Sequence, residues 1–211
     1  MSGCGGNQDH SHLWTGIAQY LPEEKRICFR NMKREDFYEY CHFGSQYGTA
    51  EKYAEELSAR TGYELKSYEE AGDINAYGTI IYIGALYAGG VMGMKKVFKN
   101  MKDPSAHKIV IATVGLADPE DKENTDTIKR GMKNQLPPEV FRNAMIFHLR
   151  GRIDYSKLGF KHKTMMSLLY KKAVNLPEEK KTTEVKAMIE TYNRQVDFVD
   201  MRSLDPIIRA L

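Results

Sequence analysis

The sequence has few of the residues that mark several protein classes. It contains three cysteines, Cys4, Cys28 and Cys41, and none after them. An odd number of cysteines without metal-ligand spacing argues against a disulfide scaffold and against a structural zinc site. A chain that lacks cysteine over most of its length suits the reducing cytoplasm, where we expect the protein to lie.

Long apolar runs are also missing. No stretch approaches the roughly 20 apolar residues that a transmembrane helix needs. The N-terminus has no apolar core of the kind that a secretory signal requires. A net charge of +3 on 211 residues is too small to indicate a nucleic-acid partner. With 42% hydrophobic and 28% charged residues, the composition is that of a globular protein with one sizeable domain.

Patterns for hydrolytic catalysis and metal binding are equally scarce. We find no paired carboxylates and no Ser–His–Asp ordering, so we predict no nucleophilic catalysis and assign no catalytic residue. The stretch that most resembles a metal-binding sequence is Asp9-His10-Ser11-His12. On a polar tail, free histidines are the simpler interpretation. We therefore expect no metal site.

The first 36 residues show no helical or strand periodicity of any length. Ile17 to Leu21 could form one turn before Pro22, and the following residues are mostly charged. We predict a poorly ordered N-terminal extension over residues 1–36 and one folded domain over residues 37–211.

The run from Phe37 to Phe43 stands where the first strand of this domain should lie. A central strand of a parallel sheet is buried on both faces and reads as continuous Val, Ile and Leu, which Glu39 and His42 contradict. One explanation is an unusual strand whose alternate residues reach solvent. The other is a change of reading frame, because A/T-ending codons for Tyr38–His42, read one base later, encode Met-Asn-Ile-Val. Resequencing the gene separates the two explanations.

A polar loop with two glycines, Gly44-Ser45-Gln46-Tyr47-Gly48, joins that run to an amphipathic helix. The first N–H groups of a helix lack partners and carry partial positive charge, so they attract anions. Glycines let the backbone close around a phosphate, and Ser45, Tyr47 and Thr49 add hydroxyl donors. No lysine follows the second glycine, so the loop is not a Walker A motif. The alternative is an ordinary turn capped by Thr49.

The segment Ser45-Gln-Tyr-Gly-Thr-Ala-Glu51 resembles the FMN-phosphate loop of the flavodoxin family. The pattern of that loop is Ser/Thr-x-Thr/Tyr-Gly-x-Thr/Ala-Glu. The resemblance implies FMN as the cofactor. It assigns the FMN phosphate to Ser45, Gln46, Tyr47, Gly48, Thr49 and Ala50.

Beyond the loop, strand-like runs alternate with helical patterns, which predicts βα units and a parallel sheet. Five strands suit a flavodoxin-like, doubly wound α/β fold with strand order 2-1-3-4-5. The predicted strands cover residues 37–43, 63–68, 79–83, 108–113 and 144–149. The predicted helices cover residues 49–60, 92–101, 121–135 and 183–199. Gly62 is well placed to cap the first of these helices.

In this strand order, a ligand binds beyond the carboxyl ends of strands one and three. Three predicted loops meet there, at residues 44–50, 84–90 and 113–118. In flavodoxins the second and third loops hold the flavin ring. The resemblance therefore assigns the ring to Ala85, Leu86, Tyr87, Gly89, Thr113, Val114 and Gly115. The alternatives are a surface tyrosine at position 87 and an ordinary βα loop at 113–115.

Residues 150–181, between the fifth strand and the last helix, exceed what a minimal fold of this type needs. They contain nine lysines and arginines against three acids. Within them, residues 158–172 alternate basic and apolar residues at helical spacing. A basic amphipathic helix suits an anionic membrane surface, a carboxylated tetrapyrrole or a quinone pocket. We expect peripheral contact with the inner face of the membrane through residues 155–175; a packed helix with a solvated basic face is the alternative.

The glycine pattern after strand three, the segment Gly151-Arg-Ile-Asp-Tyr155 and the Met-rich basic helix together resemble the flavodoxin-type protoporphyrinogen oxidases. Those are FMN proteins that pass electrons from protoporphyrinogen to a quinone. The resemblance implies an FMN oxidoreductase that acts on a small molecule or quinone. Alternatives are an electron carrier that docks protein partners, which the basic insertion disfavours, and a module that has lost flavin. His148 and His162 lie near the site edge without an assigned role.

Overall fold

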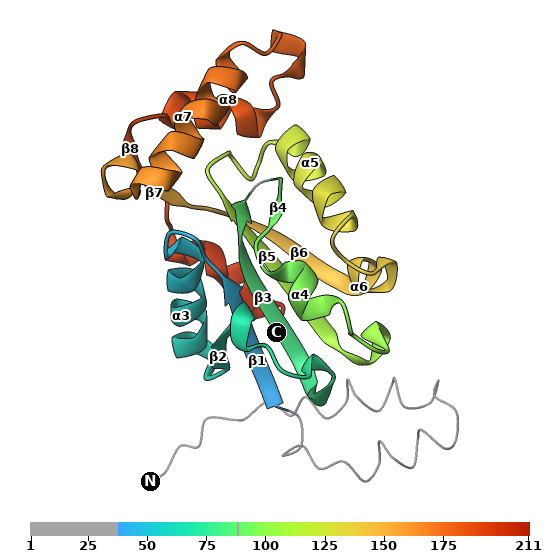
Figure 1. The fold of residues 1–211 in the computed structure, drawn as a ribbon. Helices are drawn as coiled ribbons and strands as arrows, with labels where there is room; N and C mark the ends of the chain where they lie inside the picture. Colours follow the sequence, from blue (N-terminus) through green and yellow to red (C-terminus); the bar gives the residue numbers. More distant parts are fainter. Residues whose placement is uncertain (1–37, 88) are drawn as a thin grey trace, which may run out of the picture. The chain divides into compact units, whose positions relative to one another are not determined.

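A parallel sheet forms the centre of the protein, seen in a computed structural model that describes residues 38–87 and 89–211 (Figure 1). Its strands are β1 (Tyr38–Gly44), β2 (Glu64–Ser67), β3 (Tyr77–Tyr87), β5 (Lys108–Gly115) and β6 (Ala144–Arg150). Their spatial order is β2-β1-β3-β5-β6, and every neighbouring pair is parallel. In chain order this is 2-1-3-4-5, so the predicted doubly wound α/β fold is confirmed.

Helices cover both faces of this sheet (Figure 1). One face carries α3 (Thr49–Thr61) and the C-terminal α9 (Asp205–Arg209). The other carries α4 (Met94–Phe98), α5 (Lys122–Lys133) and α6 (Pro138–Asn143). Gly62 ends α3 in the left-handed conformation and its N–H bonds the Ser58 carbonyl, as the sequence predicts.

The central strand β3 separates two hydrophobic cores because successive side chains point to opposite faces of a sheet. Ile81 and Ile83 pack with α3 and α9, whereas Ile80 and Tyr82 pack with α4 and α5. Each of these four side chains is fully buried. Burial on both faces is what a parallel sheet covered by helices requires, and it accounts for the continuous apolar sequence of the strand.

The strand β1 has an unusual sequence for a central strand, but it lies between β2 and β3 as the predicted strand order requires. From Tyr40 to His42 its side chains are buried, and His42 is only 1% exposed. Among the described residues, neither ring nitrogen of His42 has a hydrogen-bond partner. Only Glu39 is exposed in this part of the strand. Solvent access of alternate residues therefore explains why a charged residue stands at position 39. It does not explain the buried His42. The reading-frame hypothesis stays a prediction.

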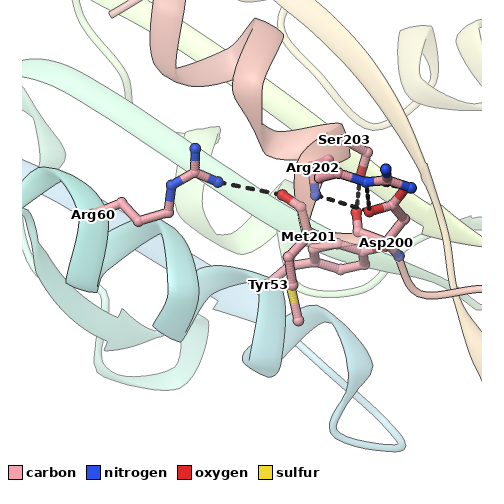
Figure 2. Close-up of polar contacts among 6 residues, drawn as sticks. All are labelled: Tyr53, Arg60, Asp200, Met201, Arg202 and Ser203. Atoms are coloured by element: carbon pink, nitrogen blue, oxygen red, sulfur yellow. Dashed lines mark hydrogen bonds and ion pairs between the residues drawn. The ribbon is translucent and has the colours of Figure 1, made fainter.

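The C-terminal segment is held on α3 by polar contacts at two points (Figure 2). The Tyr53 hydroxyl donates to the Arg150 carbonyl at 2.8 Å and accepts the Asp200 N–H at 3.1 Å. Further along α3, Arg60 donates to the Met201 carbonyl at 3.3 Å and pairs with Asp205 at 2.5 Å. These contacts fix the chain end beside the helix that follows the glycine loop.

Residues 152–197 form a separate layer, which we call the cap, beyond the carboxyl ends of the strands (Figure 1). It consists of β7 (Arg152–Asp154), α7 (Phe160–Val174), α8 (Thr183–Thr191) and β8 (Gln195–Asp197). The basic helix predicted within residues 158–172 is therefore confirmed as α7, although Ala173 is its one buried residue and several of its apolar side chains are exposed.

The predicted last helix, residues 183–199, is wrong in its second half. It ends at Thr191, and Asn193 takes a positive φ of 56° that no helix continues through. Residues 195–197 then pair antiparallel with β7. Tyr192 and Val196, at the end of the apolar pattern, give helical spacing to what is a turn and a strand.

The larger remaining differences from the prediction concern β3, β5, α4 and a helix that the prediction lacks. β3 continues past Gly84 to Tyr87 and folds back as the two-residue β4 (Gly90–Val91). β5 continues to Gly115 because β6 stays paired with it to Arg150. α4 is five residues long rather than ten. α6 is absent from the prediction; Pro138 is its first residue, where a missing N–H breaks no helical bond.

Candidate functional site

The glycine loop runs from the end of β1 into α3 at the predicted switch point. Gly44 pairs with Gly84 of β3, so the ends of the two strands lie side by side. Gly48 is the N-cap of α3 with φ 77°, a conformation that favours glycine. No side chain caps the helix there. Thr49 is the first helical residue rather than the cap, so the alternative of a turn capped by Thr49 is wrong.

Three hydroxyl groups of this loop are buried without a partner. The oxygens of Ser45, Tyr47 and Thr49 are shielded from solvent and make no hydrogen bond to the described residues. Burial, followed by the nearby Tyr87, raises the pKa of the Tyr47 phenol, which therefore stays a neutral donor. Buried polar groups are almost always satisfied in native proteins. Three orphans beside an uncapped helix N-terminus therefore indicate a site for an anion with several acceptor oxygens.

Two other residues to which the sequence assigns the phosphate, Gln46 and Ala50, take different positions. The methyl group of Ala50 is fully buried in the core against the sheet, so Ala50 can offer a ligand only its backbone N–H. The Gln46 amide nitrogen lies 3.3 Å from the Nε2 atom of His162 on α7. Its side chain thus contacts the cap.

The second predicted loop is a hairpin. Gly84 allows it, because a Cβ at that position would overlap the Val91 side chain on the returning strand. Gln135, after α5, holds β4 by accepting the Val91 N–H at 2.8 Å. Gly89 lies at the exposed turn with φ 80°. Tyr87 and Gly90 are therefore paired strand residues, where the prediction had a loop.

The side chains of this hairpin point in different directions. Ala85 packs toward the α3 face, whereas Leu86 packs on the opposite face and lies against Gly115. The Tyr87 hydroxyl lies 3.9 Å from the sulfur of Met165 on α7. Of the three, Tyr87 is the side chain that reaches the cap.

The third predicted loop is the end of β5. Thr113 is 1% exposed, and its hydroxyl lies 2.7 Å from the Nδ1 atom of His148. Val114 is buried, and the Gly115 carbonyl accepts the Gly151 N–H at 2.7 Å. The Thr113 side chain is thus engaged inside the protein, and this segment can offer a ligand chiefly its backbone. Burial lowers the pKa of His148 to about 4, so its ring is neutral at pH 7.

The cap contacts the first two loops through α7. The His162 ring lies edge-on to the Tyr47 ring, with 5.7 Å between centroids, in addition to its contact with Gln46. Met165, on the same side of the helix, reaches Tyr87. The sequence places His162 near the site edge, but it gives no signal that these two residues of α7 contact both loops.

A second group of cap residues packs beside Tyr47. Ile153, Tyr155 and Leu158 form a small buried cluster, against which Tyr47 and Leu116 pack. The Tyr155 hydroxyl is another buried oxygen without a partner among the described residues. The Arg150 guanidinium donates to the Leu116 carbonyl at 3.1 Å and lies over the Phe198 ring, which fixes the start of the third loop.

Comparison with models of known protein families shows the family to which the chain belongs. The model of the flavodoxin domain family matches residues 41–184, more than half of the chain. The chain belongs to the flavodoxin domain family. The glycine loop, the hairpin and most of the cap fall within the matched residues.

Individual relatives are distant. Among solved structures, a cysteine-to-alanine mutant of flavodoxin from Pseudomonas aeruginosa is similar at 18% identity and a TM-score of 0.34, over 64% of this chain and 95% of that one. No curated protein sequence matches the chain significantly. Within residues 38–87 and 89–211, no helix is both long and apolar enough to cross a membrane. The same residues contain no cluster of three or more His, Cys, Asp or Glu that could hold a metal ion.

Proposed function

We propose that the protein binds FMN and acts as an FMN-dependent oxidoreductase. The observation that carries this proposal is the set of three orphaned hydroxyls at the uncapped N-terminus of α3. Membership of the flavodoxin domain family supports it, because that family typically binds FMN. A flavodoxin-like module that has lost its flavin would have no reason to keep buried hydroxyls without partners.

The residues present fit this cofactor. The hydroxyls of Ser45, Tyr47 and Thr49, with the first backbone N–H groups of α3, would hold the phosphate. Tyr87 and the backbone at the end of β5 would border the ring. When bound, FMN supplies one- and two-electron redox chemistry. The protein itself would bind the phosphate at the start of α3 and border the ring with Tyr87 and the end of β5, and α7 would cover the first two loops against water.

An open apolar patch along one side of α7 supports a proposal for the electron partner. This patch, which we call the α7 patch, consists of Phe160, Lys161, Thr164, Met165, Leu168 and Leu169. Met165 also contacts Tyr87, so one side chain joins the α7 patch to the predicted ring site. Apolar side chains with a lysine among them suit a hydrophobic molecule that carries an anionic or polar group. We therefore propose a quinone as the electron acceptor, or protoporphyrinogen, with its carboxylates, as the electron donor.

The outer surface of α7 supports a peripheral membrane contact from the cytoplasmic side. Phe160 is 85% exposed and Leu168 is 64% exposed, and the helix carries exposed lysines on the same surface. Apolar side chains among cations bind anionic lipid surfaces. Co-sedimentation with vesicles that contain an anionic lipid, and loss of that binding at high salt, tests this contact; equal binding to neutral vesicles contradicts it.

The second candidate is an electron carrier that docks protein partners. The same exposed patch favours it, since basic and apolar surfaces also dock acidic proteins. A carrier would reduce an acidic protein partner as fast as it reduces a small quinone. The oxidoreductase proposed here would pass electrons from a small-molecule donor such as protoporphyrinogen to the quinone without any protein partner.

Titration of the apo-protein with FMN tests the proposal directly. We expect saturable quenching of flavin fluorescence with one FMN per chain and a rise in the melting temperature. A protein that leaves FMN fluorescence and the melting temperature unchanged would show that the proposal is wrong.

A further inference from the structure

Tyr155 carries a buried hydroxyl that the family's phosphate loop does not account for. Its side chain is 5% exposed, and the hydroxyl oxygen has no hydrogen-bond partner among the described residues. The orphaned hydroxyls of Ser45, Tyr47 and Thr49 belong to the glycine loop and the start of α3, and Tyr47 is the one shown to pack beside Tyr155. Tyr155 comes from the cap, in a part of the chain far from that loop.

The backbone brings Tyr155 back to the start of α3. After β6 the chain passes Gly151, where an added Cβ would lie 3.7 Å from the Thr49 methyl group. Gly151 is also bonded to the Gly115 carbonyl at the end of β5. β7 follows at once, and Tyr155 then packs in the buried cluster that Tyr47 joins. The cap therefore leaves the sheet beside the anion site.

The Tyr155 ring packs in a row of three tyrosines within the cap. It lies edge-on to Tyr192, at 5.4 Å between centroids, and Tyr192 in turn stacks on Tyr170 at 3.9 Å. Burial, with the nearby hydroxyls of Tyr192 and Tyr47, raises the pKa of Tyr155 to about 12. The phenol therefore keeps its proton at pH 7 and remains a hydrogen-bond donor.

We propose that Tyr155 is a ligand-binding residue that donates a hydrogen bond to the phosphate end of the cofactor. The inference rests on the proposed FMN function. It assigns to the cap a direct part in cofactor binding in addition to covering the site. A phosphate dianion bonded by groups from both α3 and the cap would also fix the cap on the sheet.

The test compares FMN with riboflavin, which lacks the phosphate, in wild type, Tyr155→Phe and the control Tyr192→Phe. A hydrogen bond to a charged group implies that Tyr155→Phe weakens FMN binding by roughly tenfold or more. Riboflavin affinity should stay unchanged in that variant. Tyr192→Phe, whose hydroxyl is on the neighbouring ring, should change neither affinity.

The melting temperature gives a second measurement that needs no activity. Because the apo-protein buries the Tyr155 hydroxyl without a partner, Tyr155→Phe should leave the apo melting temperature equal or higher while reducing the rise caused by FMN. Unchanged FMN affinity, an equal loss for riboflavin, or a destabilised apo-protein would each overturn the inference. Failure of the wild type to bind FMN would instead overturn the proposed function. That result is distinguishable from the three outcomes above, which all concern the Tyr155→Phe variant.

Discussion

At the scale of single residues, His42 is the side chain least suited to its place. It lies in a central strand, 1% exposed, with both ring nitrogens unbonded among the described residues. Burial first, and then the charge of Lys66, lower its pKa to about 4. Since an unfolded histidine titrates near pH 6.5, protonation opposes folding as the pH falls from about 6.5 to 4.

We predict that His42→Ile stabilises the protein. Removing two unbonded nitrogens from the interior should raise the free energy of unfolding at pH 7 by about 1–2 kcal/mol. Between about pH 6.5 and 4, protonation of His42 should cost the wild type up to roughly 3 kcal/mol of stability. The variant should lack this contribution and keep the one due to His148. Urea unfolding at several pH values measures both effects. A destabilised variant, or one with the same pH dependence as wild type, contradicts this account of His42.

The same residue bears on the reading-frame hypothesis. The shifted frame would place Ile and Val in this part of β1, which is what two buried faces require. A stabilising His42→Ile substitution agrees with either explanation of the strand. Resequencing the gene is what separates them: a single unbroken frame across codons 38–42 would rule the hypothesis out.

At the scale of elements, α7 combines two roles on different sides of one helix. His162 and Met165 face the glycine loop and the hairpin, whereas Phe160 and Leu168 are largely exposed. Large apolar side chains that are exposed together on a helix beside the predicted site indicate a binding surface. Substitutions on the exposed side should therefore affect the electron partner and spare FMN.

We predict that Leu168→Glu slows the reduction of a soluble quinone by the chemically reduced flavoprotein by roughly tenfold while FMN affinity stays unchanged, because the α7 patch loses an apolar contact and gains a hydrated charge. Val174→Glu is the matched control: it lies on the same helix, is exposed, and lies outside the residues of the α7 patch. The rate at which the quinone reoxidises the reduced flavin measures the effect, since the two electrons that the flavin loses reduce the quinone. Equal rates in wild type and Leu168→Glu, or equal losses in both variants, would count against the α7 patch.

Element prediction from the sequence succeeds where a local pattern decides the structure. The apolar runs of β3 and β5, the glycine that ends α3 and the basic helix α7 are all legible. The ends of β3 and β5 cannot be read from the sequence, because glycine usually indicates a turn. Here Gly84 instead allows close packing against Val91, and Gly115 allows close packing against Leu86. β8 escapes prediction because its pairing with β7 depends on residues about forty positions earlier in the chain.

At the scale of the whole molecule, the part of the chain that the structure describes, residues 38–87 and 89–211, consists of a flavodoxin-like α/β sheet with its helices and a cap beyond the carboxyl ends of its strands (Figure 1). The sequence predicts the sheet order and the glycine loop. It could not predict that the Ser45, Tyr47 and Thr49 hydroxyls would be left without partners, because the absence of a bond depends on every neighbour in space. Nor could it show that His162, Met165 and Tyr155 approach the site from a segment so distant in the chain.

The central claim is that the loop from Ser45 to Ala50 holds the phosphate of FMN. It is tested most directly by the affinities of wild type and Thr49→Val for FMN and for riboflavin. Wild type should prefer FMN by at least about a hundredfold, since several charged hydrogen bonds depend on the phosphate. Thr49→Val, which keeps the shape of the side chain, should lose roughly tenfold for FMN and nothing for riboflavin. Equal affinity of wild type for the two flavins would contradict the account.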